Sequence, residues 1–161
     1  MKLKQIILLL FIIAWMVGIF YFSNQPSDDS SKTSGRTIRA VIEIVPDIKK
    51  MEEEPKQELV EKLQHPARKL AHFSIYMLGG ILLFMFVNTF SIDIKNKILY
   101  ALSMGIIYAT TDEIHQFYIP GRSCEFRDVC IDSTGVLVGI IIMAIFYNRI
   151  NKRKKESKNE T

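Results

Sequence analysis

Four long stretches of the chain contain no charged residue, and charged or polar segments separate them. These stretches are residues 6–22, 73–90, 98–111 and 133–148, with lengths of 17, 18, 14 and 16 residues. A helix needs roughly 20 residues to cross a hydrocarbon core about 30 Å thick. The first two stretches nearly reach that length, and the other two reach it by extending into their polar flanks. The pattern predicts an all-α fold, an integral membrane four-helix bundle.

Composition supports this prediction. Of 161 residues, 48% are hydrophobic and 24% are charged, and the mean hydropathy is +0.14. So much apolar sequence excludes a disordered chain. Its separation into blocks argues against a soluble domain with a single core.

The distribution of charge predicts the orientation of the helices. The N-terminal end, the segment 91–97 and the tail after residue 148 together hold 10 basic and 3 acidic residues, whereas the alternating segments 23–72 and 112–132 hold 11 basic and 14 acidic residues. Because cytoplasmic loops are enriched in Lys and Arg, we expect both termini in the cytoplasm of a multi-pass cell membrane protein. The pI of 9.0 then reflects topology, and we expect contacts with membrane lipids and no nucleic-acid partner.

The predicted organisation has four parts. The first helix should be an uncleaved anchor, since Tyr21, Phe22 and Ser23 occupy the positions where a signal cleavage site needs small residues. The parts are the first transmembrane helix at 1–22, an extracytoplasmic loop at 23–65, a core with three transmembrane helices at 66–148 and a basic cytoplasmic tail at 149–161.

Within the long loop, residues 23–34 are polar and rich in turn-forming types. Apolar residues then recur at helical spacing until Pro46, which predicts a short amphipathic helix on the outer surface. Pro66 suits the first turn of a helix, so we expect the second span to begin there. The recurring apolar residues are Ile38, Val41, Ile42 and Val45.

Several residues that membranes disfavour fall at the outer ends of the predicted spans. The third span must continue through residues 112–116, and the fourth should begin before Asp132. Charges at that depth cost several kcal/mol unless they are paired or hydrated. Basic partners, Arg68 among them, occur at the same depth, so we expect an outer-facing polar pocket. Its predicted ligand-binding residues are Lys69, His72, Tyr76, Asp112, Glu113, Gln116, Arg122, Arg127, Asp128 and Asp132.

The sequence is compatible with three different roles for this pocket. In one, the charges pair only with one another and hold the helices in register. In another, the basic groups bind an anion such as a lipid headgroup, a phosphate or a peptide terminus. In the third, an acidic residue acts as general base beside a histidine, or the same groups hold a divalent metal. The anion-binding candidates are Arg122, Arg127, Lys69 and His72, and the catalytic candidates are Asp112, Glu113, His72 and His115.

We predict no metal and no cofactor, because residues 112–116 (Asp-Glu-Ile-His-Gln) lack the two histidines of the zinc-protease pattern. Cys124 and Cys130 have a spacing that matches no zinc motif. Both fall on the predicted outer side, where either a disulfide or two unpaired thiols is compatible with the sequence. Residues 119–122 (Ile-Pro-Gly-Arg) have Pro and Gly in the order of a type II turn, which predicts a tight connection between the last two spans.

Four segments resemble the VanZ-like membrane protein family. They match its patterns F-S-x-Q-P, K-x-x-H-x-x-x-Y, D-E-x-x-Q-x-x-x-P-G-R and D-x-x-x-[ND]-x-x-G-x-x-x-G. The matching residues are 22–26, then Lys69, His72 and Tyr76, then 112–122, and finally Asp128, Asp132, Gly135 and Gly139.

The resemblance implies a four-span inner-membrane protein of the cell envelope. The family takes its name from a member linked to resistance to the glycopeptide teicoplanin, and no settled reaction comes with it. The charged groups at the outer ends of the spans lead us to expect an anionic envelope component as the partner, such as a lipid headgroup or a lipid-linked cell-wall precursor. The family commonly has Asn where this chain has Asp132, and the added negative charge slightly favours binding of a cation or a metal here.

Overall fold

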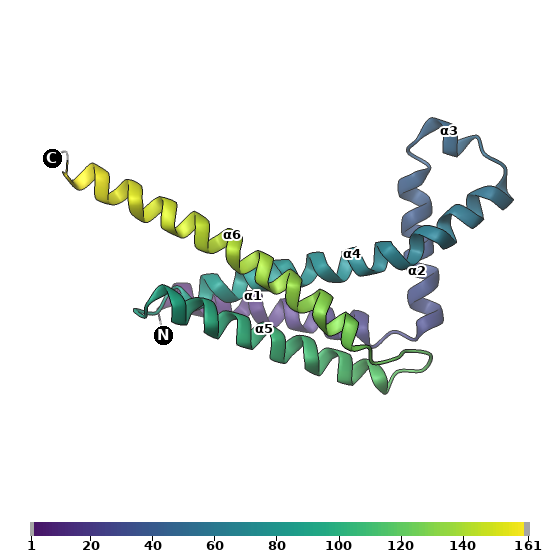
Figure 1. Cartoon of the computed structure of the whole chain (residues 1–161). Helices are drawn as coiled ribbons and strands as arrows, with labels where there is room; N and C mark the ends of the chain where they lie inside the picture. Colours follow the sequence, from purple (N-terminus) through teal and green to yellow (C-terminus); the bar gives the residue numbers. More distant parts are fainter. Residues whose placement is uncertain (1, 160–161) are drawn as a thin grey trace.

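The computed structural model describes residues 2–159, which form six helices and no strand. The all-α prediction is confirmed (Figure 1). The helices are α1 (Leu3–Ser23), α2 (Ser27–Ile42), α3 (Pro46–Lys49), α4 (Glu53–Val87), α5 (Ile94–Phe117) and α6 (Phe126–Asn159).

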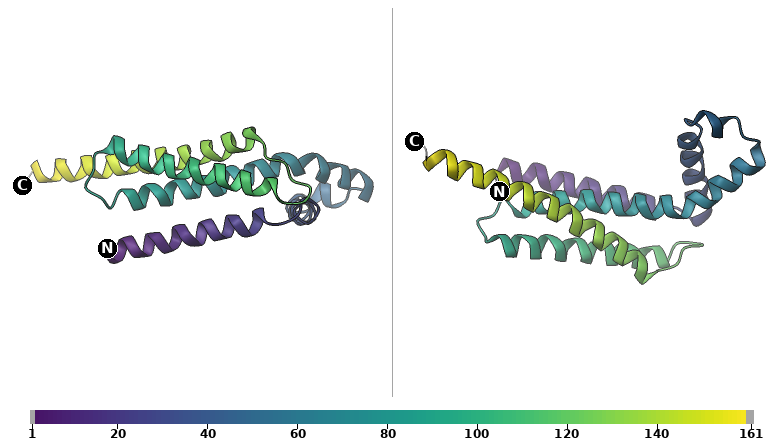
Figure 2. Two further views of the ribbon diagram at one scale, coloured as in Figure 1. Left: turned by 90° about the horizontal axis from the view of Figure 1, so that it is seen from below. Right: turned by 45° about the horizontal axis from the view of Figure 1, so that its top comes forward.

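The four long helices lie side by side. Helix α4 contacts α1, α5 and α6, and α5 also contacts α1 and α6. Helices α2 and α3 lie beyond one end of this group, and α2 runs across the direction of the long helices (Figures 1 and 2). Helix α1 begins and α6 ends at the opposite end of the molecule (Figure 1).

Among the residues that the structure describes, three helical segments are long and apolar enough to cross a membrane. They are Leu3–Ser23, Glu53–Val87 and Phe126–Arg153. Helix α5 is not one of them, because charged residues lie in both its first and its last turns. The three segments fit the predicted membrane protein.

The structure corrects the prediction for the start of the long loop. Residues 23–34 are not a series of turns, because α2 already begins at Ser27. Asp28 and Asp29 occupy its first turn, where negative charge stabilises the helix dipole. The predicted helix is present at Ile38, Val41 and Ile42. It ends at Ile42, so Val45 lies outside it.

The second long helix begins at Glu53, so the expectation that it starts at Pro66 is wrong. The segment before Pro66 is rich in Glu, Lys and Gln, which favour helices. Contacts with α2 hold this segment, since Gln64 Nε2 donates hydrogen bonds to the Ser31 carbonyl and, at 3.0 Å, to Ser34 Oγ. These interactions outweigh the one backbone hydrogen bond that a proline inside a helix removes.

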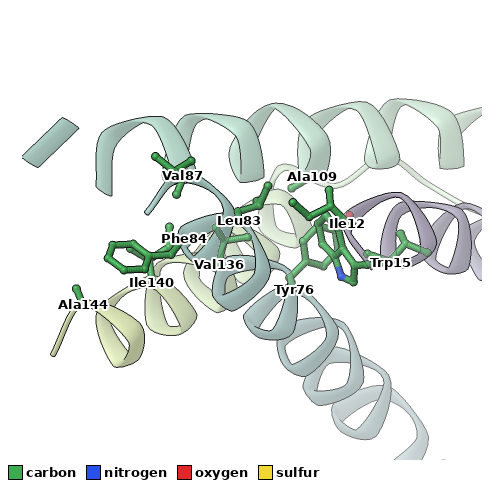
Figure 3. Close-up of a cluster of buried hydrophobic side chains, with 12 residues drawn as sticks. Ile12, Trp15, Tyr76, Leu83, Phe84, Val87, Ala109, Val136, Ile140 and Ala144 are labelled. Carbon is green, nitrogen blue, oxygen red and sulfur yellow. The ribbon is translucent and has the colours of Figure 1, made fainter. Parts of the chain in front are cut away.

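Helices α4 and α6 approach each other through glycines. A Cβ at Gly80 would overlap the backbone of Val136, and a Cβ at Gly139 would overlap the Met77 carbonyl. Gly135 takes part in the same close contact, because a Cβ there would also meet α4 backbone. Around this contact lies the main apolar core, which includes Tyr76, Phe84, Val136 and Ile140 (Figure 3).

Candidate functional site

The polar cluster lies where α5 and α6 meet the middle of α4, at the end of the long helices nearest to α2. Helical spacing turns one face of α4 and one face of α5 toward it, because residues three and four apart share a face. The connection between α5 and α6 closes the cluster. We define it as Lys69, His72, Tyr76, Asp112, Glu113, Gln116, Arg122, Asp128 and Asp132.

Asp112 and Glu113 are buried at the centre of the polar cluster, with exposures of 4% and 1%. The Tyr76 hydroxyl donates a hydrogen bond to Asp112 Oδ2 at 3.1 Å, and Gln116 Nε2 donates to the same oxygen at 3.1 Å. The Gln116 amide also lies 3.2 Å from Glu113 Oε1. Glu113 Oε2 accepts from the backbone N–H of Glu125 at 3.4 Å. Two helices and the α5–α6 connection therefore fix these carboxylates.

Two acidic residues of α6 face α4. Asp128 forms an ion pair with Lys69, and both side chains are 22% exposed. Asp132 is fully buried, and its Oδ1 lies 3.6 Å from His72 Nδ1. The Asp128–Lys69 and Asp132–His72 pairs lie on the same face of α6, because Asp128 and Asp132 are about one helical turn apart.

Arg122 links three parts of the chain. Its Nη1 donates to Gln116 Oε1 at 2.9 Å, its Nε to the Gln25 carbonyl at 3.0 Å and its Nη2 to the Phe22 carbonyl at 3.3 Å. The predicted tight turn positions it: Gly121 has φ of 75° and the Arg122 N–H donates to the Ile119 carbonyl at 3.1 Å, as a type II turn requires. The guanidinium thus holds the end of α1 against the end of α5.

Most of the predicted site residues come together, and two do not. His115 turns toward α1, where its ring stacks on Phe20 with centroids 4.6 Å apart. Arg127 is exposed and has no hydrogen bond or ion pair to residues 2–159. Cys124 and Cys130 are both exposed and form no disulfide. No pattern in the sequence indicates the backbone carbonyls that bind Arg122.

Two hollows adjoin the polar cluster. An apolar groove of about 1070 Å³ runs between α1 and α4, lined along its length by residues such as Phe11, Trp15, Gly18 and Leu78. A smaller pocket of about 170 Å³ is lined by polar residues, including Lys69 and Asp128. Arg68, His72 and Arg122 border both hollows, so the groove ends at basic side chains.

Repulsion between the two arginines at this end affects Arg122. Burial lowers the pKa of Arg122 from its usual value, the positive charge of Arg68 lowers it further, and Asp112 and Glu113 oppose this. Arg68 is half-buried and has no carboxylate within ion-pair distance among residues 2–159. An anion between these two guanidinium groups would relieve the repulsion.

A comparison with known protein families identifies the family of this chain. The sequence model of the VanZ/LLP1 family matches residues 8–147. The chain belongs to the VanZ/LLP1 family. No curated protein and no solved structure matches it. In this VanZ/LLP1 protein, the match extends from the first long helix to the fourth and includes every residue of the polar cluster.

Proposed function

We propose that this VanZ/LLP1 protein is a four-span membrane protein that binds an amphiphile with an anionic headgroup at its outer face. The lipid chains would lie in the groove between α1 and α4, and the headgroup would meet Arg68 and Arg122. An anionic membrane lipid and a lipid-linked cell-wall precursor share this chemistry. Both termini would face the cytoplasm.

The fourth span in this proposal is α5. Its 24 residues extend about 36 Å, enough for a bilayer core. It packs against α1, α4 and α6, and its carboxylates Asp112 and Glu113 are buried in the protein instead of facing lipid. An even number of spans also agrees with the excess of basic residues at both ends of the chain.

The observation that carries the proposal is the composition of the groove along its length. Apolar side chains of α1 and α4 line most of it, and two arginines lie at one end. Apolar walls accept acyl chains, and guanidinium groups bind phosphate or carboxylate oxygens through paired N–H donors. Arg68 is the better candidate for direct contact, because Arg122 already donates three hydrogen bonds within the protein.

The single tryptophan, Trp15, gives a direct test, because it lines the groove. The purified chain in nanodiscs would receive brominated phosphatidylglycerol or brominated phosphatidylcholine, and quenching of Trp15 fluorescence would be measured. We expect the same degree of Trp15 quenching at a several-fold lower mole fraction of brominated phosphatidylglycerol than of brominated phosphatidylcholine. Equal quenching by both lipids would contradict anionic selectivity.

Two variants separate the headgroup from the chains. Arg68→Gln should remove most of the preference for the anionic lipid, whereas the matched change Arg127→Gln should leave it. Gly18→Leu should block quenching by both lipids, since a Cβ at Gly18 would meet nothing within 4 Å and a larger side chain can project into the groove. Retained selectivity in Arg68→Gln would show that the headgroup lies elsewhere.

The source of the amphiphile needs a separate measurement. Mass spectrometry of lipids that co-purify with the native chain, compared with Gly18→Leu, would distinguish a bulk phospholipid from a wall precursor. Teicoplanin susceptibility of a sensitive host expressing the native chain or Arg68→Gln would test the link that the family name suggests. If the native chain gives no protection at confirmed membrane levels, the antibiotic role does not apply to this protein.

A second candidate function is an enzyme acting on the bound amphiphile. Buried Glu113 and Asp112 next to the groove end favour it, with His72 as the nearby imidazole; His115 points away from the cluster. Glu113→Gln keeps the shape and hydrogen bonding of the side chain but cannot exchange a proton. An enzyme would convert the co-purifying lipid in the native form and leave it intact but bound in Glu113→Gln, whereas a binder would leave it unchanged in both.

A further inference from the structure

We infer that Asp112, Glu113 and Asp132 form a binding site for one hard divalent cation, of the class of Mg²⁺, Mn²⁺ or Ca²⁺. The three residues come from α5 and α6; the sequence placed them in one polar pocket but did not single them out as a group. This inference does not depend on lipid in the groove. It concerns the buried centre of the polar cluster, behind the arginines that border the groove.

The geometry suits a shared ion. One carboxylate oxygen from each of the three residues lies within 4.8 Å of the other two. Two oxygens that bind the same Ca²⁺ at its usual distance of about 2.4 Å can be at most about 4.8 Å apart. The spacing therefore meets this condition for one shared ion, and Ca²⁺ requires a smaller inward movement of the side chains than Mg²⁺ or Mn²⁺.

Asp132 supplies an independent indication of a missing partner. Its side chain is fully buried, and neither carboxylate oxygen accepts a hydrogen bond from any group within residues 2–159. A buried carboxylate without hydrogen bonds is costly, so native proteins pair such groups or bind them to metal ions. Because one of its oxygens belongs to the three-carboxylate group, the unsatisfied atoms point at the proposed ion.

The three carboxylates have few basic groups in direct contact. No basic side chain within residues 2–159 lies within ion-pair distance of Asp112 or Glu113: Lys69 pairs with Asp128, and Arg122 donates its hydrogen bonds to Gln116 and to two backbone carbonyls. His72 is the one basic group beside Asp132, at 3.6 Å. A single imidazolium cannot neutralise three buried carboxylates, whereas an ion of charge +2 together with it can.

The donor set indicates the kind of ion. Three carboxylates offer only oxygen atoms, which Mg²⁺, Mn²⁺ and Ca²⁺ prefer, while structural zinc sites use Cys and His. Hard ions also retain water. The polar pocket of about 170 Å³ is bordered by Gln116 and His72, which contact the carboxylates, so it offers space for metal-bound water and a path for entry.

The test is a metal titration of the full chain in detergent after treatment with a chelator. Mn²⁺ binding would be followed by the loss of the free-ion electron paramagnetic resonance signal, and competition by Mg²⁺ and Ca²⁺ would rank the ions. We expect one site per chain and an increase in the thermal unfolding temperature on adding the ion. Absence of stoichiometric binding to the folded native chain would overturn the inference without any variant.

Matched variants locate the site. Asp132→Asn retains the shape of the side chain and should weaken Mn²⁺ binding at least tenfold. Asp128→Asn removes the same charge one turn away on α6, outside the three-carboxylate group, and should change binding less than threefold. Equal weakening by both variants would mean that general negative charge attracts the ion, and unchanged binding in both would place the ion elsewhere; either result contradicts the proposed site.

Discussion

Helix α4 has two very different neighbours. Toward α6 it has a backbone-to-backbone contact, because Gly80, Gly135 and Gly139 leave no side chain between the helices. Toward α1 it relies on one large side chain: the indole of Trp15 lies over Gly79 and its Nε1 donates to the Ile75 carbonyl at 2.9 Å. The first contact is close along two helical turns, whereas the second leaves the apolar groove beside it.

The two interfaces of α4 therefore have different roles. Between membrane helices the hydrophobic effect contributes little, so close packing of small residues is a main source of association. The glycine contact therefore holds α6 in a fixed register, which fixes Asp128 and Asp132 opposite α4. The looser contact of α1 leaves open the groove that the proposed amphiphile would occupy. We expect substitutions in the first interface to affect stability more than those in the second.

The largest effect should come from Gly139→Ala. The new methyl group would overlap the Met77 carbonyl, so the two backbones must separate. Overpacking of this kind typically costs about 1–3 kcal/mol and sometimes more, and this variant should be at or above the upper end because the overlapping atoms belong to backbone, which cannot adopt another rotamer. We expect a clearly lower unfolding temperature in detergent, measured by thermal unfolding with size-exclusion chromatography as a check on aggregation.

Gly18→Ala is the matched control for this prediction. Gly18 lies on α1, and a Cβ there would meet nothing within 4 Å. Because Ala favours helix over Gly by about 1 kcal/mol, this variant should be as stable as the native chain or slightly more so. Equal destabilisation by the two variants would contradict the contrast between the interfaces.

Arg122→Lys should have the next largest effect. Lysine keeps the charge but cannot reach the Gln25 carbonyl, the Phe22 carbonyl and Gln116 together. Loss of one hydrogen bond to a charged group costs about 1.5–3 kcal/mol. We expect a corresponding fall in the free energy of unfolding, with Arg127→Lys unchanged because Arg127 is exposed. A native-like Arg122→Lys protein would show that this arginine does not hold α1 in place.

The sequence predicts the features that depend on residues close together in the chain, and it fails where residues far apart in the chain contact each other. The four long helices follow from local hydrophobicity, and the facing of His72 and Tyr76 follows from helical spacing. The start of α4 at Glu53 could not be predicted, because contacts with α2 stabilise the turns before Pro66. His115 was misplaced for a similar reason, since its neighbour Phe20 comes from a distant helix.

The three-carboxylate group shows the same limit. Asp112 and Glu113 are adjacent in the sequence, but Asp132 joins them only through the packing of α6 against α4 and α5, where the glycines of α6 meet α4 backbone and Gly105 of α5 meets Val136. A motif search for zinc ligands therefore missed a group of oxygen donors. The type II turn at Gly121, in contrast, was predicted because its residues are consecutive.

Trp15→Phe should have a moderate effect. Phenylalanine retains much of the contact with Gly79 and Tyr76 but cannot donate the hydrogen bond to the Ile75 carbonyl. A hydrogen bond of this kind contributes about 1 kcal/mol, so we expect a small decrease in the unfolding temperature. Phe117→Leu, at an exposed position, is the control. A loss as large as that of Gly139→Ala would mean that the α1 contact is not the weaker one.

The smallest effect should come from the ion pair between Lys69 and Asp128. It also joins α4 to α6, but both side chains are 22% exposed, so water screens the charges. Pairs at the protein surface typically contribute about 0–1 kcal/mol. We expect a double-mutant cycle with Lys69→Met and Asp128→Asn to give a coupling energy in this range, smaller at high salt. A coupling above about 2 kcal/mol would mean that the charges at the polar end, and not the glycines alone, set the register of α6 against α4.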